Sequence, residues 1–308
     1  MEQNKSIWAK TPMMIFGAMI CCFLWGSAFP CIKTGYRLFH IAGDDTASQI
    51  LFAGCRFTIA GMMVIAFSSV SKRKIVTPKS PGRIAILSAF QTIIQYLFFY
   101  IGLAHTTGVK SSIITGAGTF LTLFVCSLGF RQEKLTTRKI IGSLLGFVGI
   151  IIVNLSGKGL DFDFSLLGEG FVFIAAFSSA MASGYIKKFS KDSDVVMLSG
   201  YQFFFGGIIM ATIGTVMGGT LNGFSAKAVV LLLYMGFISA MAYTLWGILL
   251  KYNDVSKVST CKFMNPIFGV VLSFILLREN NTIGWQMFVA LLLVSVGIFI
   301  VNKKNKSR

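Results

Sequence analysis

The chain has 308 residues, of which 55% are hydrophobic and only 13% are charged, and its mean hydropathy is +0.75. A soluble domain of this length could not bury so much apolar surface, so the composition indicates that a lipid bilayer is its solvent. The formal net charge is +17, but the basic residues lie in short gaps between apolar runs and form a dense cluster only in the C-terminal tail. This distribution argues against a nucleic-acid partner.

Apolar runs of membrane-spanning length follow one another along the whole chain. The hydrocarbon core of a bilayer is about 30 Å thick and needs about 20 apolar residues per helix. We therefore predict an all-α integral membrane protein without an inserted soluble domain. The first run has spanning length and no clear cleavage site, so it is counted as a helix and not as a signal peptide. The ten predicted spans are residues 12–32, 48–70, 84–104, 109–130, 138–155, 165–186, 194–218, 226–250, 255–277 and 283–301.

Several short segments recur about 146 residues further along the chain. The matched pairs are residues 148–154 with 296–302, Arg56-Phe57 with Gln202-Phe203, and Glu133 with Glu279. The recurrence predicts two five-helix repeats, at 12–155 and 165–302. Because an odd number of crossings reverses the direction of the chain, the second repeat should be inverted relative to the first. Inverted halves are typical of transporters that open alternately to each side of the membrane.

Lysine and arginine are distributed unequally between the two predicted sides of the membrane. The side that holds both termini and the loops after the even-numbered spans carries 20 of the 28 Lys and Arg residues, and the other side carries 6. Basic residues are enriched in cytoplasmic loops. We therefore expect both termini in the cytoplasm and the protein in the cell membrane. Arg56 and Lys262 remain inside predicted spans.

Several motifs, in order along the chain, resemble the EamA family of the drug/metabolite transporter superfamily. The resemblance covers nearly the whole chain as two repeats. It implies a ten-helix unit whose central cavity is lined by helices 1, 3, 4, 6, 8 and 9, and a protein that moves small metabolites across the cytoplasmic membrane, often outward and often coupled to protons. The motifs are Leu24 to Phe29, Arg56-Phe57, Gly129 to Glu133, Gly168-Glu169, Asn265-Pro266 and Glu279.

Two cations lie within predicted spans, where an ionisable side chain costs about 2.5–3.5 kcal/mol on insertion scales. Lys262 lies near the middle of the ninth span, and Pro266 deprives its carbonyl of the usual helical partner. This combination predicts a polar station that faces the cavity, although Lys262 could also reach the membrane surface or a neighbouring backbone oxygen. Arg56 has the neutral repeat mate Gln202, and we expect both residues, like Pro266, to have structural roles.

Acidic residues are absent from the middle of every predicted span, which argues against a carboxylate-based Na⁺ site. Glu169 lies about one turn inside the sixth span and is the candidate for proton coupling, but it could equally be a partner of the helix dipole. Glu133 and Glu279 follow the fourth and ninth spans and are expected to pair with nearby bases or loop amides. Two buried cations without a central acid predict a carboxylate-bearing solute.

Aromatic side chains supply the other half of a small-molecule site. Tyr96 and Tyr100 lie one turn apart on the third span, and Tyr243 and Trp246 lie three apart on the eighth, so each pair shares a helix face. Under the repeat, Tyr100 corresponds to Trp246. The predicted substrate-binding residues are Trp25, Ser27, Tyr96, Tyr100, Thr119, Tyr243, Trp246, Lys262 and Asn265.

The resulting prediction is a secondary transporter, in the export direction, of small metabolites such as amino acids or related carboxylate-bearing solutes. Alternating access would move the solute, with proton coupling as an option. We expect no enzymatic activity, cofactor or metal, because the chain has only two histidines and no glycine-rich lysine loop for ATP. A non-transporting receptor or scaffold remains an alternative, with a membrane-embedded enzyme the weakest one, and the sequence leaves the oligomeric state open.

Overall fold

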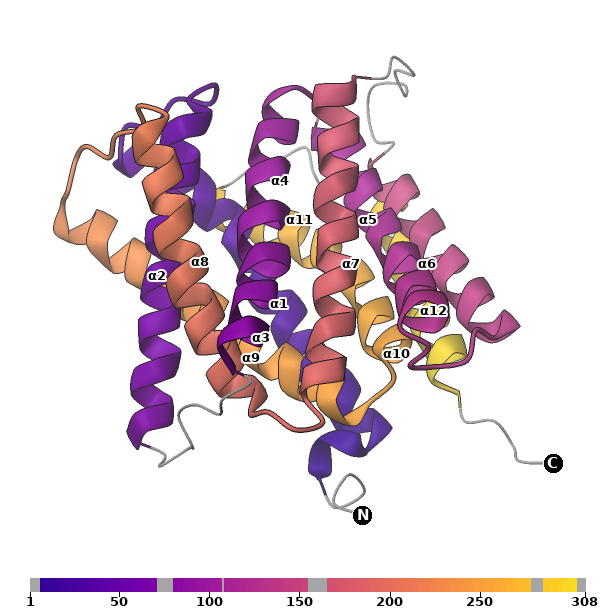
Figure 1. Ribbon diagram of the computed structural model, residues 1–308. Helices are drawn as coiled ribbons and strands as arrows, with labels where there is room; N and C mark the ends of the chain where they lie inside the picture. Colours follow the sequence, from indigo (N-terminus) through magenta and orange to yellow (C-terminus); the bar gives the residue numbers. More distant parts are fainter. Residues whose placement is uncertain (1–5, 71–79, 107, 155–164, 278–284, 304–308) are drawn as a thin grey trace.

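The computed structural model describes residues 6–70, 80–106, 108–154, 165–277 and 285–303, which form a bundle of helices with no strand among them (Figure 1). Within these ranges, nine helices are long and apolar enough to cross a membrane. The helices are α1 (Thr11–Leu38), α2 (Thr46–Val70), α3 (Ser80–Leu87), α4 (Gln95–Ala104), α5 (Gly108–Phe124), α6 (Thr137–Asn154), α7 (Phe171–Phe189), α8 (Val195–Val216), α9 (Ala226–Tyr252), α10 (Val255–Thr260), α11 (Met264–Leu277) and α12 (Trp285–Asn302).

Some spanning segments contain turns that are not α-helical. A 3-10 turn, η6 (Cys261–Phe263), separates α10 from α11. Pro266 follows this turn, and because it has no N–H it cannot pair with the carbonyl of Lys262, which accounts for the change of helix type. The π-helical segments are η3 (Ser88–Ile94) between α3 and α4, η4 (Val125–Gly129) at the end of α5, and η5 (Leu166–Gly170) at the start of α7.

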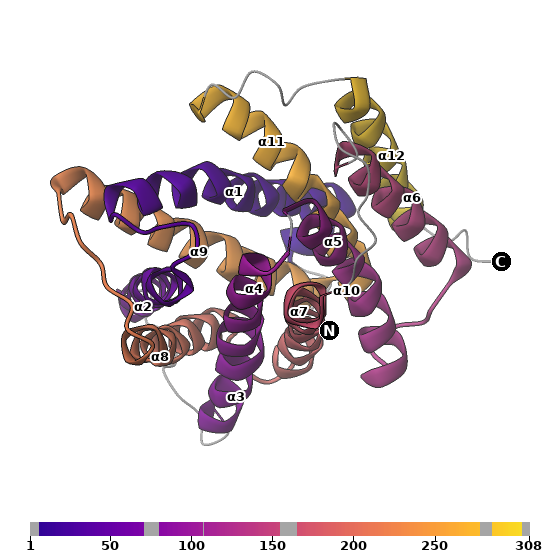
Figure 2. The same ribbon diagram turned by 90° about the horizontal axis from the view of Figure 1, so that it is seen from above.

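The predicted fifth span forms α6, which is helical but is not among the nine described helices that meet the criteria for a membrane span. It has 18 residues and begins next to two charges, Arg138 and Lys139. Along its length α6 lies against α12 in both views (Figures 1 and 2). Gly142 of α6 approaches Val301, and Gly149 approaches Val294. As one residue number rises the other falls, so α6 and α12 are antiparallel.

Helices α2 and α8 pack with their backbones in close contact. A Cβ atom placed on Gly54 would lie 2.3 Å from the backbone nitrogen of Ala211, and one placed on Gly61 would lie 2.3 Å from that of Phe204. Glycine therefore allows two backbones to touch, as small residues commonly do between membrane helices. The order of these contacts shows that α2 and α8 are also antiparallel.

The first and last helices are placed as an even number of crossings requires. In Figure 1, α1 begins and α12 ends at the same, lower end of the bundle. This agrees with the predicted common side for the two termini, while the side of the membrane to which that end belongs stays a prediction.

Candidate functional site

Aromatic rings from α1 and α9 meet inside the bundle. The ring of Trp25, on α1, has its centroid 5.0 Å from that of Tyr243 and 5.1 Å from that of Trp246, which both lie on α9. Trp246 is only 2% exposed. These three predicted substrate-binding residues are therefore brought together by the fold.

The rings continue from α9 through α8 and α2 to α4. Phe203 of α8 lies 4.9 Å from Tyr243 and stacks on Phe57 of α2 at 5.4 Å, and Phe57 lies 4.5 Å from Tyr96 of α4. The hydroxyl groups of Tyr96 and Tyr243 contact each other, and Tyr100 follows at 6.3 Å from Tyr96. We call the connected rings the aromatic cluster; its members are Trp25, Phe57, Tyr96, Phe203, Tyr243 and Trp246.

A cation lies at each end of the aromatic cluster. The ammonium of Lys262, in η6, is 5.3 Å from the ring centroid of Trp246. The guanidinium of Arg56, on α2, is 4.4 Å from the ring of Phe57 and 5.7 Å from that of Tyr96. A cation over a ring face is attracted by the ring quadrupole. Both cations left in the membrane by the sequence analysis therefore belong to one site.

Several buried polar atoms around the aromatic cluster have no hydrogen-bond partner. They are Nε1 of Trp25, Nε of Arg56, Oε1 of Gln95 and Nε2 of Gln202. Buried polar atoms in native proteins are nearly always paired with protein or water, so each exception needs a reason. Groups that a bound solute would satisfy are one such reason, and their position beside the rings favours it.

The other predicted binding residues lie outside the aromatic cluster. The hydroxyl of Ser27 donates to the carbonyl of Leu24 at 2.8 Å and lies 3.4 Å from the hydroxyl of Tyr234. Thr119 is buried on α5, and none of the rings of the aromatic cluster belongs to that helix. Asn265, at the start of α11, has a buried Oδ1 atom without a partner.

Glu169 lies at the junction between η5 and the connection before α5. Its carboxylate accepts hydrogen bonds from the hydroxyl of Thr106 and, at 2.6 Å, from the backbone N–H of Ser165. The ammonium of Lys110 is 3.5 Å away. Each of these contacts favours the ionised carboxylate. In this conformation Glu169 ties the start of the second half to the first half.

Glu133 ties the connection between η4 and α6 to the start of α10. Its carboxylate accepts hydrogen bonds from the backbone N–H of Ser256 at 3.1 Å and from the Ser256 hydroxyl at 2.9 Å. The ammonium of Lys139 lies 3.2 Å away. An acid at a helix N-terminus satisfies a backbone donor that has no partner within the helix. Its repeat mate Glu279 lies outside the described residues.

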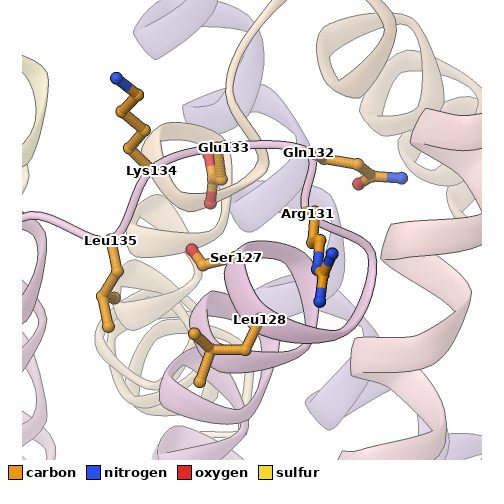
Figure 3. Close-up of a pocket in the computed structure, with 7 residues that line it drawn as sticks. All are labelled: Ser127, Leu128, Arg131, Gln132, Glu133, Lys134 and Leu135. Carbon is orange, nitrogen blue, oxygen red and sulfur yellow. The ribbon is translucent and has the colours of Figure 1, made fainter.

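The backbone around Glu133 borders an open hollow at the end of η4 (Figure 3). Arg131 has a φ of 51°, and the N–H of Gln132 bonds to the carbonyl of Cys126 at 2.9 Å, so the chain turns sharply there. The ammonium end of Lys134 points away from the other lining side chains in Figure 3. The residues that line it are Ser127, Leu128, Arg131, Gln132, Glu133, Lys134 and Leu135.

Glu133 should make stability depend on pH. Burial raises the pKa of Glu133 above its ordinary value, and Lys139 and the Ser256 hydroxyl offset only part of the rise. A raised pKa in the folded state means that the folded protein binds the proton more tightly than the unfolded chain. Protonated Glu133 therefore adds to the free energy of unfolding. This contribution is complete below about pH 4.3 and is lost as the pH rises through the pKa that Glu133 has in the folded protein. Glu133→Gln should remove this loss in thermal unfolding measured from pH 4 to 8.

Asp44→Asn is the matched control, because Asp44 is an exposed acid between α1 and α2. It should leave the pH dependence of the unfolding temperature as it is in the unmodified protein. If the unfolding temperature depended on pH equally in Glu133→Gln and in the unmodified protein, the expectation would be contradicted.

Four members of the site were not among the predicted substrate-binding residues. Phe57 and Phe203 are repeat mates, and their recurrence in the Arg-Phe and Gln-Phe pairs was a signal that could have identified them. Gln95 directly precedes Tyr96, but no spacing marked it. Arg56 was expected to be structural, and its neighbours in the fold are the rings of the site.

The arrangement defines the class of protein. Apolar helices of spanning length, with polar and aromatic groups buried between them, make the chain a multi-pass membrane protein. The chain belongs to the EamA-like transporter family, whose model matches residues 12–155 and 166–303. This confirms the resemblance stated from the sequence motifs.

Two relatives with similar sequences span nearly the same length as this chain, and a third is matched over only two thirds of its own length. The uncharacterized transporter YvbV of Bacillus subtilis is 26% identical, over 94% of this chain and 93% of the relative. The S-adenosylmethionine/S-adenosylhomocysteine transporter of Chlamydia muridarum is 23% identical, over 94% of this chain and 90% of the relative. The WAT1-related protein At3g02690 of Arabidopsis thaliana is 25% identical, over 91% of this chain and 67% of the relative.

A solved crystal structure has a similar fold. It superposes with a TM-score of 0.76 over 93% of this chain and 95% of the other, at 14% sequence identity. At that identity the likeness concerns the fold alone.

Proposed function

We propose that the protein is a secondary transporter that exports small carboxylate-bearing metabolites, such as amino acids, across the cell membrane by alternating access. The observation that carries this proposal is the aromatic cluster with a cation at each end, built by helices from both halves of the chain. A site between two halves is exposed to either side when the halves rock against each other.

The packing of corresponding helices supports an inverted relation between the halves. Helices α2 and α8 are repeat mates and pack antiparallel. Helices α6 and α12 are also repeat mates and also pack antiparallel. In addition, α1 packs against α9 and α11, while its mate α7 packs against α4 and α5, the mates of those two helices. Antiparallel mates with matching neighbours are what a two-fold axis in the membrane plane would produce.

Ties between the halves at both ends of α5 support alternating access. At the start of α5, Lys110 and the preceding Thr106 hold Glu169 of the second half. After α5 and η4, Glu133 holds Ser256 of the second half. A rocking transporter must break its contacts at one end while those at the other end hold, and these ties lie at opposite ends of one spanning segment.

The charges of the site support a carboxylate-bearing solute. Arg56 is a permanent cation and Lys262 is a second basic group, and none of the acids in the described residues makes an ion pair with either of them. The solutes named for the Chlamydia muridarum relative are amino-acid derivatives. The predicted substrate-binding residues remain a proposal, with Trp25, Tyr96, Tyr243, Trp246 and Lys262 favoured by their mutual contacts.

Proton coupling through Glu169 would follow from its position. Protonation would remove the attraction to Lys110 and one acceptor for the Ser165 N–H, and so would release the tie before α5. Glu169→Gln should abolish the response of transport to a pH jump while exchange at equal pH on both sides continues. The measurement is uptake into proteoliposomes with and without a pH step; a pH response that survives the substitution would rule out Glu169 as the coupling group.

Solute flux tests the function itself. The full-length protein in proteoliposomes should exchange a labelled amino acid from a panel for unlabelled solute, faster than protein-free liposomes. A protein that binds members of the panel without moving them would be a receptor or scaffold, and the proposal would fail.

A further inference from the structure

Arg56 is a buried permanent charge in the membrane-spanning part of α2. The residue is only 5% exposed, and no carboxylate of the described residues lies within 4 Å of its guanidinium. We propose that Arg56 is the carboxylate-binding and selectivity-determining residue of the transport site, for solutes that carry one carboxylate on an apolar or aromatic body. The inference rests on the proposed transport function and reassigns a residue that the sequence alone suggests is structural.

The energetic argument begins with the missing counter-charge. An unpaired buried charge costs several kcal/mol, and an arginine cannot avoid the cost by losing its proton. The rings of Phe57 and Tyr96 recover part of it through cation–π attraction. However, Nε of Arg56 is buried without a hydrogen-bond partner. A bound anion would supply both the missing charge and the missing acceptor.

The groups around Arg56 match a carboxylate. The ring of Tyr96 lies 5.7 Å from the guanidinium of Arg56, and the Tyr96 hydroxyl contacts that of Tyr243. A neutral tyrosine hydroxyl can donate a hydrogen bond, and a guanidinium presents two parallel donors to the two oxygens of a carboxylate. The adjoining rings offer apolar surface for the body of the solute.

The repeat mate shows that the fold does not require this charge. Gln202 is fully buried at the equivalent position of α8, and its side-chain oxygen accepts a hydrogen bond from the Thr92 hydroxyl at 2.7 Å. The equivalent position of the second half therefore holds an uncharged side chain, whose oxygen is paired and whose Nε2 atom is not. The arginine in the first half is explained by what it binds.

Charge balance favours a carboxylate over a phosphate at Arg56. One guanidinium neutralises one carboxylate, whereas a phosphate monoester carries about −1.5 to −2 charges near pH 7 and would leave an excess in the membrane. Lys262 differs because a lysine ammonium can give up its proton when buried, so it does not demand an anion. Arg56 is thus the cation that selects the solute.

Thermal unfolding of the full-length protein in detergent tests the inference. The probes are benzoate, phenylacetate, L-phenylalanine and L-leucine, each compared with the amide of the same body and with sodium chloride alone. We expect at least one carboxylate to raise the unfolding temperature, and its amide and chloride to leave it unchanged. In Arg56→Gln the apparent dissociation constant of that carboxylate should rise at least about tenfold.

The unfolding temperature of the ligand-free Arg56→Gln variant is a second measurement, and it distinguishes a binding role of Arg56 from a structural one. Removing an uncompensated charge should keep the unfolding temperature of Arg56→Gln equal to or above that of the unmodified protein, whereas loss of a structural tie would lower it. Arg37→Gln, which removes an exposed arginine near the end of α1, should keep the carboxylate response. A lower unfolding temperature for ligand-free Arg56→Gln would overturn the inference. So would equal stabilisation by amide or chloride, no response to any carboxylate, or an undiminished response in Arg56→Gln.

Flux measurements separate this inference from the proposed function. If the unmodified protein exchanges a solute and Arg56→Gln keeps the same preference for carboxylate over amide, Arg56 is not the selecting residue but the protein is still a transporter. If carboxylates bind through Arg56 and nothing is exchanged, the inference stands and the transport proposal fails.

Discussion

Replacing Gly54 with valine should leave little folded protein in the membrane. A Cβ atom at this position would lie 2.3 Å from the backbone nitrogen and 2.6 Å from the Cα atom of Ala211. Because these are backbone atoms, no side-chain rotation makes room, and α2 must move away from α8. Overpacking in a tight core costs about 1–3 kcal/mol and sometimes more, and here the displacement would extend along the whole contact. Size-exclusion chromatography with fluorescence detection, followed by thermal unfolding, measures the loss.

The control lies on another helix of the first half. Gly82, on α3, has open space around its Cα position, so Gly82→Val should fold as the unmodified protein does. Adding Ala211→Gly to Gly54→Val should not rescue folding, since the clash is with the backbone. If Gly54→Val unfolded at the same temperature as the unmodified protein, α2 and α8 would not be in contact as described.

The sequence was informative where the bilayer sets the answer. The run predicted at 226–250 is α9 (Ala226–Tyr252), and the run at 48–70 is α2 (Thr46–Val70), because the thickness of the hydrocarbon core fixes how many apolar residues a crossing needs. The fifth predicted span is the shortest, and α6 carries two charges close to its start. The position and length of a membrane-spanning helix can thus be predicted from the apolar run in its own sequence.

Helix faces were harder to predict, because most of these helices are apolar all round and periodicity marks no inner side. Ser27 shows the consequence: it follows Trp25 by two residues, which is about 200° around a helix, and it contacts Tyr234 while Trp25 contacts Trp246. The spacing alone could have separated the two. Tertiary packing was needed to show that Arg56 lies against rings of the site.

The internal repeat carried more site information than the spacing along single helices. Tyr96 and Tyr243 are 147 residues apart, one more than the repeat spacing of 146, and meet through their hydroxyls. The repeat mates Phe57 and Phe203 stack at 5.4 Å. Under an inverted relation, equivalent residues near the symmetry axis come together. Matched aromatic positions in the two halves are therefore the best sequence indication of where the site lies.

Trp246→Ala should lose both stability and solute binding. Trp246 is 2% exposed and is among the largest fully buried side chains, and it contacts Trp25 at 5.1 Å and the Lys262 ammonium at 5.3 Å. Truncating a buried tryptophan to alanine costs about 3–5 kcal/mol, because the cavity that remains is only partly filled. The same change removes the ring between Trp25 and Lys262, so thermal unfolding and equilibrium exchange in proteoliposomes should both decline.

Trp285→Ala is the matched control, because Trp285 begins α12 and is 69% exposed. It removes the same side chain without opening a cavity, so its unfolding temperature should stay near that of the unmodified protein. Trp246→Phe separates packing from binding: a smaller ring fills much of the space but offers less surface to Lys262, so stability should recover more than solute affinity. If Trp246→Ala and Trp285→Ala shifted the unfolding temperature equally, Trp246 would not be the central packing residue of the site.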